Sequence, residues 1–347
     1  MIAGISIVPW IIKFLWSGII DRFSQIQKKI FILIGGSLGT LCFFTLFFIN
    51  PSVTLLLFTF IFFMSHVFIS FFDSAADIWA IEISTKEERG KINAAMQAGL
   101  WIGGGTSAIL FSSIARIYDY PIVFPIAGII ILIISLFPLI IKEEKTTIKQ
   151  KKITPLLIKE FKDKIIQKMS MYASLISISS GILTITIPLY LRNILDLDVA
   201  QVGTMAAIVP LMIVPGNIIG GHMADKNGRK QTIIIFILMK IIFTIFLIFS
   251  YNWWLLIIIY GIVLLVDGGF TSAQGALFMD LTNPKVGATQ FSLFSGFMGL
   301  GDVGGRMIAG LLIVLVGFTN LFILSGLILI PPLILLSFIK IRNEHII

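Results

Sequence analysis

Long apolar stretches, separated by short polar turns, constrain this chain more than any other feature. A helix needs about 20 apolar residues to cross the hydrocarbon layer of a bilayer. Eleven stretches meet or approach that length, and they cover residues 1–20, 30–50, 53–79, 92–116, 121–141, 168–191, 199–222, 231–250, 253–279, 288–316 and 319–339. The sequence therefore predicts an all-α integral membrane protein with about eleven transmembrane helices.

The composition excludes several other classes of protein. Of the 347 residues, 57% are hydrophobic and only 13% are charged, whereas about a quarter is charged in a soluble domain. The net charge of +8 comes from Lys and Arg strung between apolar stretches, which does not indicate a nucleic-acid-binding surface. The single Cys and the three scattered His show no metal-ligand spacing, so we expect no metal and no cofactor.

Basic residues fall in alternate loops, and this distribution predicts the orientation. One side holds Arg22, Lys28, Lys29, Lys86, Arg89, Lys91, Lys226, Arg229, Lys230, Lys340 and Arg342, whereas the other holds Arg116 and Arg192. By the positive-inside rule the first side is cytoplasmic, and with it the C-terminus. We therefore expect a multi-pass protein of the cell membrane.

An internal repeat predicts two homologous halves. "DRFSQIQKKIFI" from Asp21 parallels "DKNGRKQTIIIF" from Asp225, and Glu82 parallels Asp280 in the following helix-loop segment. Such repeats are typical of transporters. We expect an N-terminal half of five spans over residues 1–141, a basic cytoplasmic linker over 142–167 that is partly an amphipathic surface helix, and a C-terminal half of six spans over 168–347. The first half is shorter by one span and a turn, so the bundle resembles two six-helix halves without the first helix.

Several motifs carry a family resemblance. "GHMADKNGRK", Gly221 to Lys230, resembles the G-x-x-x-D-(R/K)-x-G-R-(K/R) loop of the major facilitator superfamily. "PWIIKFLWSGIIDR" from Pro9, "DSAADIWAIEISTKEERG" from Asp73 and "ATQFSLFSG" from Ala288 are similar to its AmpG-type muropeptide permease and acetyl-coenzyme A transporter branch. Two positions depart from that branch: Gly18 replaces a usual Pro, and Trp101 stands where muropeptide permeases tend to carry Arg.

The resemblance implies a cytoplasmic gate at these loops. Asp225 at a helix end can face the N-terminal dipole of another helix, and Gly221 permits close helix approach. The gate residues expected from the motifs are Asp21, Arg22, Glu82, Arg89, Gly221, Asp225, Lys226, Gly228, Arg229 and Lys230. A solvated basic turn is the alternative interpretation.

Charged groups inside the spans mark a candidate transport pathway, because an ionisable group in the bilayer costs a few kcal/mol and usually faces a cavity or a partner. Asp73 and Asp77 lie one helical turn apart, and Asp77 could equally end the span in water. Lys13 could reach the interface, or face the cavity and meet Asp73 or an anionic group of a substrate. Asp267 and Trp101 complete the candidate pathway, whereas Lys240 has no assignment from the sequence. Asp302 and Arg306, at i and i+4, are expected to form a structural ion pair, and a role in the cavity is the second interpretation.

Three functions remain open on the sequence. The leading hypothesis is a secondary active transporter, not an enzyme, which moves a small organic solute by alternating access. The solute would carry an anionic group, and the coupling ion would be a proton bound at Asp73. The protein would act as a monomer. The sequence contains no phosphate-binding loop motif, so nothing in it indicates direct use of ATP. The alternatives are a membrane sensor or degenerate carrier that does not transport, and a membrane enzyme acting on lipid-linked substrates.

Overall fold

The computed structural model describes residues 7–23, 25–142 and 153–339, and all regular secondary structure in these ranges is helical. The helices are α2 (Val8–Ile11), α3 (Phe14–Arg22), α4 (Lys28–Phe47), α5 (Leu55–Ile83), α6 (Arg89–Tyr118), α7 (Val123–Leu136), α8 (Ile153–Lys162), α9 (Lys164–Asn193), α10 (Val199–Ile208), α11 (Ile213–Asn227), α12 (Arg229–Phe246), α13 (Trp253–Leu281), α14 (Gly287–Leu327) and α15 (Ile330–Phe338). The predicted all-α membrane fold is confirmed.

Nine helical segments in the described ranges are long and apolar enough to cross a membrane. Two differences separate this number from the eleven predicted spans. The stretch 1–20 corresponds to the short helices α2 and α3, with residues 1–6 outside the described part. The last two stretches form one segment, Pro284–Phe338, in which Gly317 bends the chain with a φ of 76°.

The helices divide between two compact units. The first comprises Met1–Ser84, Thr106–Glu160 and Thr282–Gly296, and the second comprises Thr85–Gly105, Phe161–Leu281 and Phe297–Ile347. Helices α6, α8 and α14 contribute to both units. The helix α8 lies within the predicted linker, whose residues 143–152 fall outside the described part.

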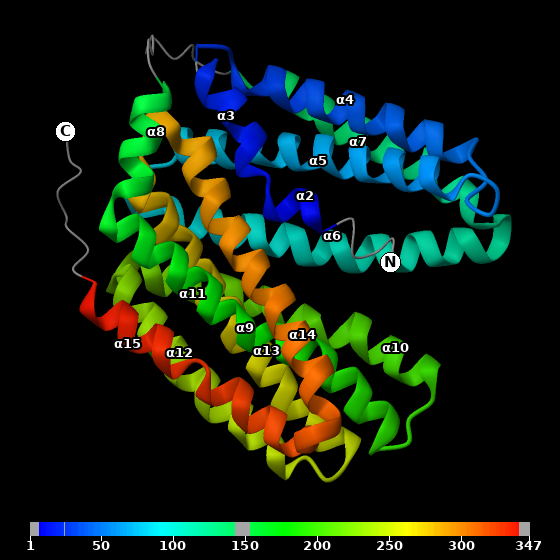
Figure 1. Cartoon of the computed structure of the whole chain (residues 1–347), viewed down its shortest axis with the longest axis vertical. Coiled ribbons are helices and arrows are strands. Elements are labelled where there is room, and N and C mark those ends of the chain that lie inside the picture. The colour runs from blue at the N-terminus through cyan, green and yellow to red at the C-terminus, as the bar shows by residue number, and fades with distance from the viewer. Residues whose placement is uncertain (1–6, 24, 143–152, 340–347) are drawn as a thin grey trace. The chain divides into compact units, whose positions relative to one another are not determined.

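Close packing in the first unit brings α4 against both α5 and α7, and Figure 1 shows these three helices running side by side. Small residues permit this approach. A Cβ on Gly36 would lie 2.3 Å from the Cβ of Ser135, and one on Gly35 would lie 2.9 Å from the carbonyl oxygen of Phe68. Helices in a membrane associate through such close van der Waals contacts rather than through the hydrophobic effect.

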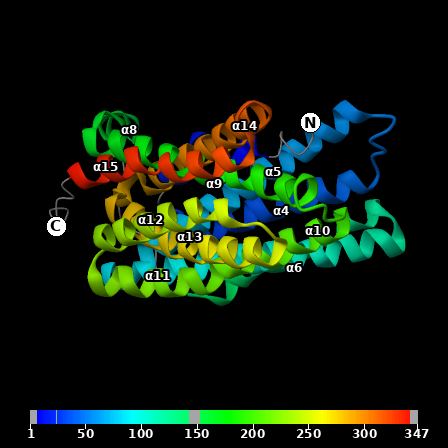
Figure 2. The same ribbon diagram turned by 90° about the horizontal axis from the view of Figure 1, so that it is seen from below.

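In the second unit α13 packs against α11 and α12, as Figure 2 shows. The helix α9 is in equally close contact with α14. A Cβ on Gly301 would lie 1.9 Å from the carbonyl oxygen of Ser174, and one on Gly181 would lie 2.1 Å from that of Asp302. These glycines bring the polar residues of α9 and α14 to one place.

We expect Gly301→Ala to destabilise the protein, because the new methyl group would overlap the α9 backbone and force the helices apart. Overpacking of this kind costs about 1–3 kcal/mol. The matched control is Gly304→Ala, since a Cβ at Gly304 meets nothing within 4 Å. Thermal unfolding of both variants in detergent would test this, and equal midpoints for the two would contradict the close contact.

Candidate functional site

A buried lysine and two carboxylates meet in the first unit. Lys13 lies between α2 and α3, and Asp73 and Asp77 lie one turn apart on α5. The Nζ atom of Lys13 lies 2.8 Å from Oδ2 of Asp73 and 3.0 Å from Oδ2 of Asp77. The side chain of Asp73 is 37% exposed and that of Asp77 is 9% exposed. Asp73 is therefore the accessible member of this cluster, which we call the Lys13 cluster.

The charges of the Lys13 cluster do not balance. One ammonium group faces two carboxylates, and two carboxylates that share a site rarely both stay ionised in a desolvated environment. Hydroxyl groups extend the polar contacts next to the cluster: Ser17 donates to the backbone oxygen of Lys13, and its hydroxyl lies 2.8 Å from those of Ser74 and Ser292. Because both carboxylates contact the one ammonium group, Lys13 would keep a charged partner if either carboxylate lost its charge.

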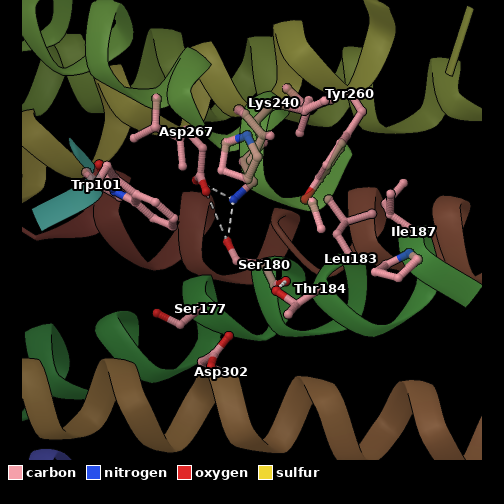
Figure 3. A pocket seen from close by; sticks show the side chains of 18 of the residues that line it. Trp101, Ser177, Ser180, Leu183, Thr184, Ile187, Lys240, Tyr260, Asp267 and Asp302 are labelled. Carbon is pink, nitrogen blue, oxygen red and sulfur yellow. Dashed lines mark hydrogen bonds and ion pairs between the residues drawn. The ribbon is translucent and has the colours of Figure 1, made fainter. Parts of the chain in front are cut away.

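The second unit contains a cavity of about 580 Å³ lined by α6, α9, α10, α11, α12, α13 and α14. Its volume lies within the range of small-molecule sites, and much of its wall is apolar. Figure 3 shows the ammonium group of Lys240 between Asp267 and Ser180, with Trp101 on one side and Tyr260, Leu183 and Ile187 on the other.

Lys240 and Asp267 form an ion pair in the cavity wall. Nζ of Lys240 lies 2.6 Å from Oδ1 of Asp267 and donates to Oγ of Ser180 at 2.8 Å. The side chain of Lys240 is 1% exposed and that of Asp267 is 14% exposed. Burial of both charges is tolerable because they are paired and hydrogen-bonded.

Asp302 and Arg306 also pair and also line the cavity. Nε and Nη2 of Arg306 each lie 2.8 Å from Oδ2 of Asp302. The i, i+4 pairing expected from the sequence is therefore present, and the structure adds that both residues face the space also lined by Trp101 and Asp267.

Asp21 binds the N-terminus of α14 within the first unit. It accepts hydrogen bonds from the backbone N–H of Ala288 at 3.0 Å and of Thr289 at 2.8 Å, and from the Thr289 hydroxyl at 2.6 Å. A carboxylate is favoured there by the unpaired N–H groups and the dipole of the helix. Asp21 follows the predicted span 1–20 directly. Burial raises the pKa of its carboxyl to about 6, and the hydrogen bonds from Thr289 and Ala288 oppose that shift.

Asp225 makes the corresponding contact with α6 in the second unit. It accepts hydrogen bonds from the backbone N–H of Gly90 at 2.9 Å and of Lys91 at 3.0 Å, and it pairs with Arg229. The internal repeat relates the two sets of contacts. The amides that Asp21 binds lie 198 residues after those that Asp225 binds (288 − 90 = 198 and 289 − 91 = 198), which is also the offset between Glu82 and Asp280 (280 − 82 = 198). We call the two sets of contacts the Asp21 and Asp225 latches.

Further charges surround each latch. Asp280 binds Arg89 at 3.0 Å and Arg229 at 3.2 Å, so it joins the Asp225 latch to the end of α13. In the first unit Lys28 binds Glu82 at 3.1 Å. A Cβ on Gly221 would lie 2.5 Å from the carbonyl oxygen of Gly90, so glycine is required where α11 meets α6.

The remaining predicted gate residues lie outside these contacts. Arg22 and Lys226 have exposed side chains. Gly228 joins α11 to α12 with a φ of 91°, which suits glycine. Lys230 donates to the backbone oxygens of Ser337 and Ile339, so it binds the end of α15.

A family model for the Major Facilitator Superfamily matches residues 1–168 and again residues 169–345. The chain belongs to this superfamily. A sequence relative within it is AmpG 1 of Rickettsia bellii (strain RML369-C), a protein named as a transporter, which is 26% identical over 97% of this chain and 88% of its own length. The predicted resemblance to the superfamily and to its AmpG-type branch is thus confirmed.

Solved structures of the superfamily share the fold at low identity. The human organic anion transporter MFSD10 (TETRAN) is 13% identical with a TM-score of 0.76, over 96% of this chain and 82% of its own. The fucose:proton symporter FucP of E. coli is 11% identical with a TM-score of 0.76, over 97% of this chain and 90% of its own. At such identities the comparison shows a major facilitator fold.

Sequence reasoning missed the pairing of Lys240 with Asp267 in this major facilitator chain. A signal was present, because the predicted spans 231–250 and 253–279 are joined by the short turn Tyr251–Asn252. Lys240 precedes that turn by about three helical turns and Asp267 follows it by about four, so the two lie at similar depth on antiparallel neighbours. A long lysine side chain covers the remaining difference.

Proposed function

We propose that the chain is a secondary active transporter that moves a small organic solute across the cell membrane by alternating access, with protons as the coupling ion. The observation that carries this proposal is the Lys13 cluster, in which one buried ammonium group faces two carboxylates. Loss of the charge on either carboxylate would leave the other to pair with Lys13, and Asp73 is the acid that solvent reaches more easily. The cluster can therefore change its charge while it stays paired, as a coupling site requires.

The cavity of the second unit is the proposed solute site. Its size and largely apolar wall suit a small organic molecule, and its charged groups would fix the orientation of that molecule. We propose that the solute carries an anionic group, because Arg306 lines the cavity and its side chain is 38% exposed. MFSD10 is named as an organic anion transporter and FucP as a proton symporter, and these names support both parts of the proposal.

Alternating access also needs contacts that break and reform. The Asp21 and Asp225 latches are suitable, because each joins a carboxylate in the last turn of one helix to the N-terminus of a helix that is distant in sequence. We propose that they hold the cytoplasmic side closed in one state. We expect a monomer to suffice, since the Lys13 cluster, the cavity and both latches are formed within one chain.

Proteoliposomes that enclose a pH-sensitive dye would test the proposed function. A panel of small organic solutes is added outside, and we expect one or more to drive proton entry together with their own uptake. Binding without flux of solute or proton would favour a membrane sensor. Chemical conversion of a lipid-linked substrate without solute flux would favour a membrane enzyme.

The orientation gives a separate prediction. A reporter fused after Ile347 should read cytoplasmic, as should one inserted within Lys145 to Lys152, because basic loops stay inside. Both positions lie outside the described residues. A fluorescent protein and alkaline phosphatase should be compared at each position, because the first reports a cytoplasmic location and the second the opposite side of the membrane. Phosphatase activity at either position would contradict the proposed topology.

A further inference from the structure

Two ion pairs line the described part of the cavity, and they differ in which of their charges is accessible. In the first pair the cation is hidden, since Lys240 is 1% exposed, whereas its partner Asp267 is 14% exposed. In the second pair both side chains are accessible, since that of Arg306 is 38% exposed and that of Asp302 is 29% exposed. A molecule in the cavity can thus reach a carboxylate on α13 and a guanidinium group on α14.

Asp267 retains capacity to accept hydrogen bonds. Lys240 occupies Oδ1 at 2.6 Å, whereas the Ser180 hydroxyl lies at 3.4 Å from Oδ2, which is longer than a good O–H···O bond. A carboxylate has about four lone-pair positions. The ammonium group of Lys240 also lies 5.8 Å from the centroid of the Phe270 ring, and its side chain is only 1% exposed. Asp267 is therefore built to meet a cationic group.

Arg306 retains donors. Its Nε and Nη2 both bind a single oxygen of Asp302, so part of the planar fork of five N–H groups remains for another acceptor. Planar two-point contact with carboxylates is the geometry that guanidinium groups favour. The charges in the described lining of the cavity, Lys240, Asp267, Asp302 and Arg306, sum to zero. A solute with a net charge would leave one charge uncompensated in this apolar surrounding, whereas a zwitterion would leave none.

We propose that the cavity binds a zwitterionic solute with an apolar body, whose ammonium group contacts Asp267 and whose carboxylate contacts Arg306. The apolar body lies against residues such as Leu183, Ile187 and Tyr260, which Figure 3 shows beside the Lys240–Asp267 pair. This inference rests on the proposed function, because it identifies the class of solute for the same cavity. The anionic group of the proposed solute is then one of two opposite charges that the same molecule carries.

Matched ligands would test the class. The probes are phenylalanine and the dipeptide phenylalanyl-leucine, each compared with its N-acetylated form, which keeps only the negative charge, and its C-amidated form, which keeps only the positive charge. Binding to the purified full chain in nanodiscs is measured by isothermal titration. We expect a zwitterion of the set to bind at least about tenfold more tightly than both blocked forms, because each charged contact contributes that much.

Variants then assign each charge to its partner. Arg306→Gln should abolish the preference for a free carboxylate and keep that for a free amine. Asp267→Asn should abolish the preference for a free amine and keep that for a free carboxylate. Because this substitution leaves Lys240 buried without its acid, the double variant Asp267→Asn with Lys240→Met is used if the single variant does not fold. Ser112→Ala, on an exposed part of α6, is the control that should bind as the wild type does.

The results separate this inference from the proposed function. No binding by either zwitterion, or equal binding by a blocked form, overturns the inference even if another solute is transported. Preferential binding of a zwitterion without flux in proteoliposomes upholds the solute class and contradicts the transporter. Preferences that persist in the variants overturn the assignment to Asp267 and Arg306.

Discussion

Asp73→Asn should reduce concentrative uptake to the level of protein-free liposomes while leaving the protein folded. The substitution removes the more exposed carboxylate of the Lys13 cluster, and Asp77 still binds Lys13 at 3.0 Å. The charge of the cluster is then fixed, so solute movement can no longer be coupled to protons. Exchange of labelled for unlabelled solute needs no net proton movement and should persist. Uptake against an imposed pH gradient, measured beside exchange, would show both effects.

Asp77→Asn is the matched control one helical turn away. It keeps the accessible acid and the 2.8 Å contact between Lys13 and Asp73, so it should impair coupling less than Asp73→Asn does. Some loss is expected, because protonation of Asp73 would then leave Lys13 without a charged partner in the cluster. The double variant Asp73→Asn with Asp77→Asn leaves Lys13 buried without a carboxylate in the cluster, which costs about 3–5 kcal/mol and should prevent stable expression. Adding Lys13→Met should restore expression but not concentrative uptake. If Asp73→Asn still accumulates solute with an unchanged pH dependence, Asp73 is structural.

The fold could be predicted from the sequence because its strongest signals are local. A span is a run of apolar residues within one segment, and a motif such as Gly221 to Lys230 is a contiguous stretch. Helix breaks are harder to predict. The first span is interrupted at Ile12 and Lys13 although neither is a glycine or proline, and Gly317 joins two predicted spans into one segment.

Partners between helices could be predicted only in part. Contact with Asp73 was one of the alternatives for Lys13, and the structure places the two 2.8 Å apart. Helical periodicity puts Asp77 on the same face as Asp73, but it does not indicate that both share one ammonium group. The pairing of Asp280 with Arg89 and Arg229 depends on three helix ends that are distant in sequence. Such contacts follow from the angle and rotation of packed helices, which an apolar pattern does not determine.

Asp225→Ala should lower the rate of transport by about tenfold or more without preventing insertion into the membrane. The alanine removes the acceptor for the N–H groups of Gly90 and Lys91 and the partner of Arg229. Hydrogen bonds to a charged group contribute about 1.5–3 kcal/mol each, so the closed state should lose much of its stability relative to the open one. Insertion depends on the apolar spans, which the substitution leaves unchanged. Initial rates of solute uptake at equal protein density would measure the effect.

A local readout distinguishes the loss of the latch from general damage. In Asp225→Ala the amide hydrogens of Gly90 and Lys91 should exchange faster with solvent, while those of Ala288 and Thr289 at the Asp21 latch of the other unit should keep their protection. Lys226→Ala is the control, because it alters the adjacent exposed residue of the same turn. If Asp225→Ala transports at the wild-type rate, opening of this latch does not limit the cycle. If its exchange is also unchanged, the turn is a solvated loop and the contact has no part in gating.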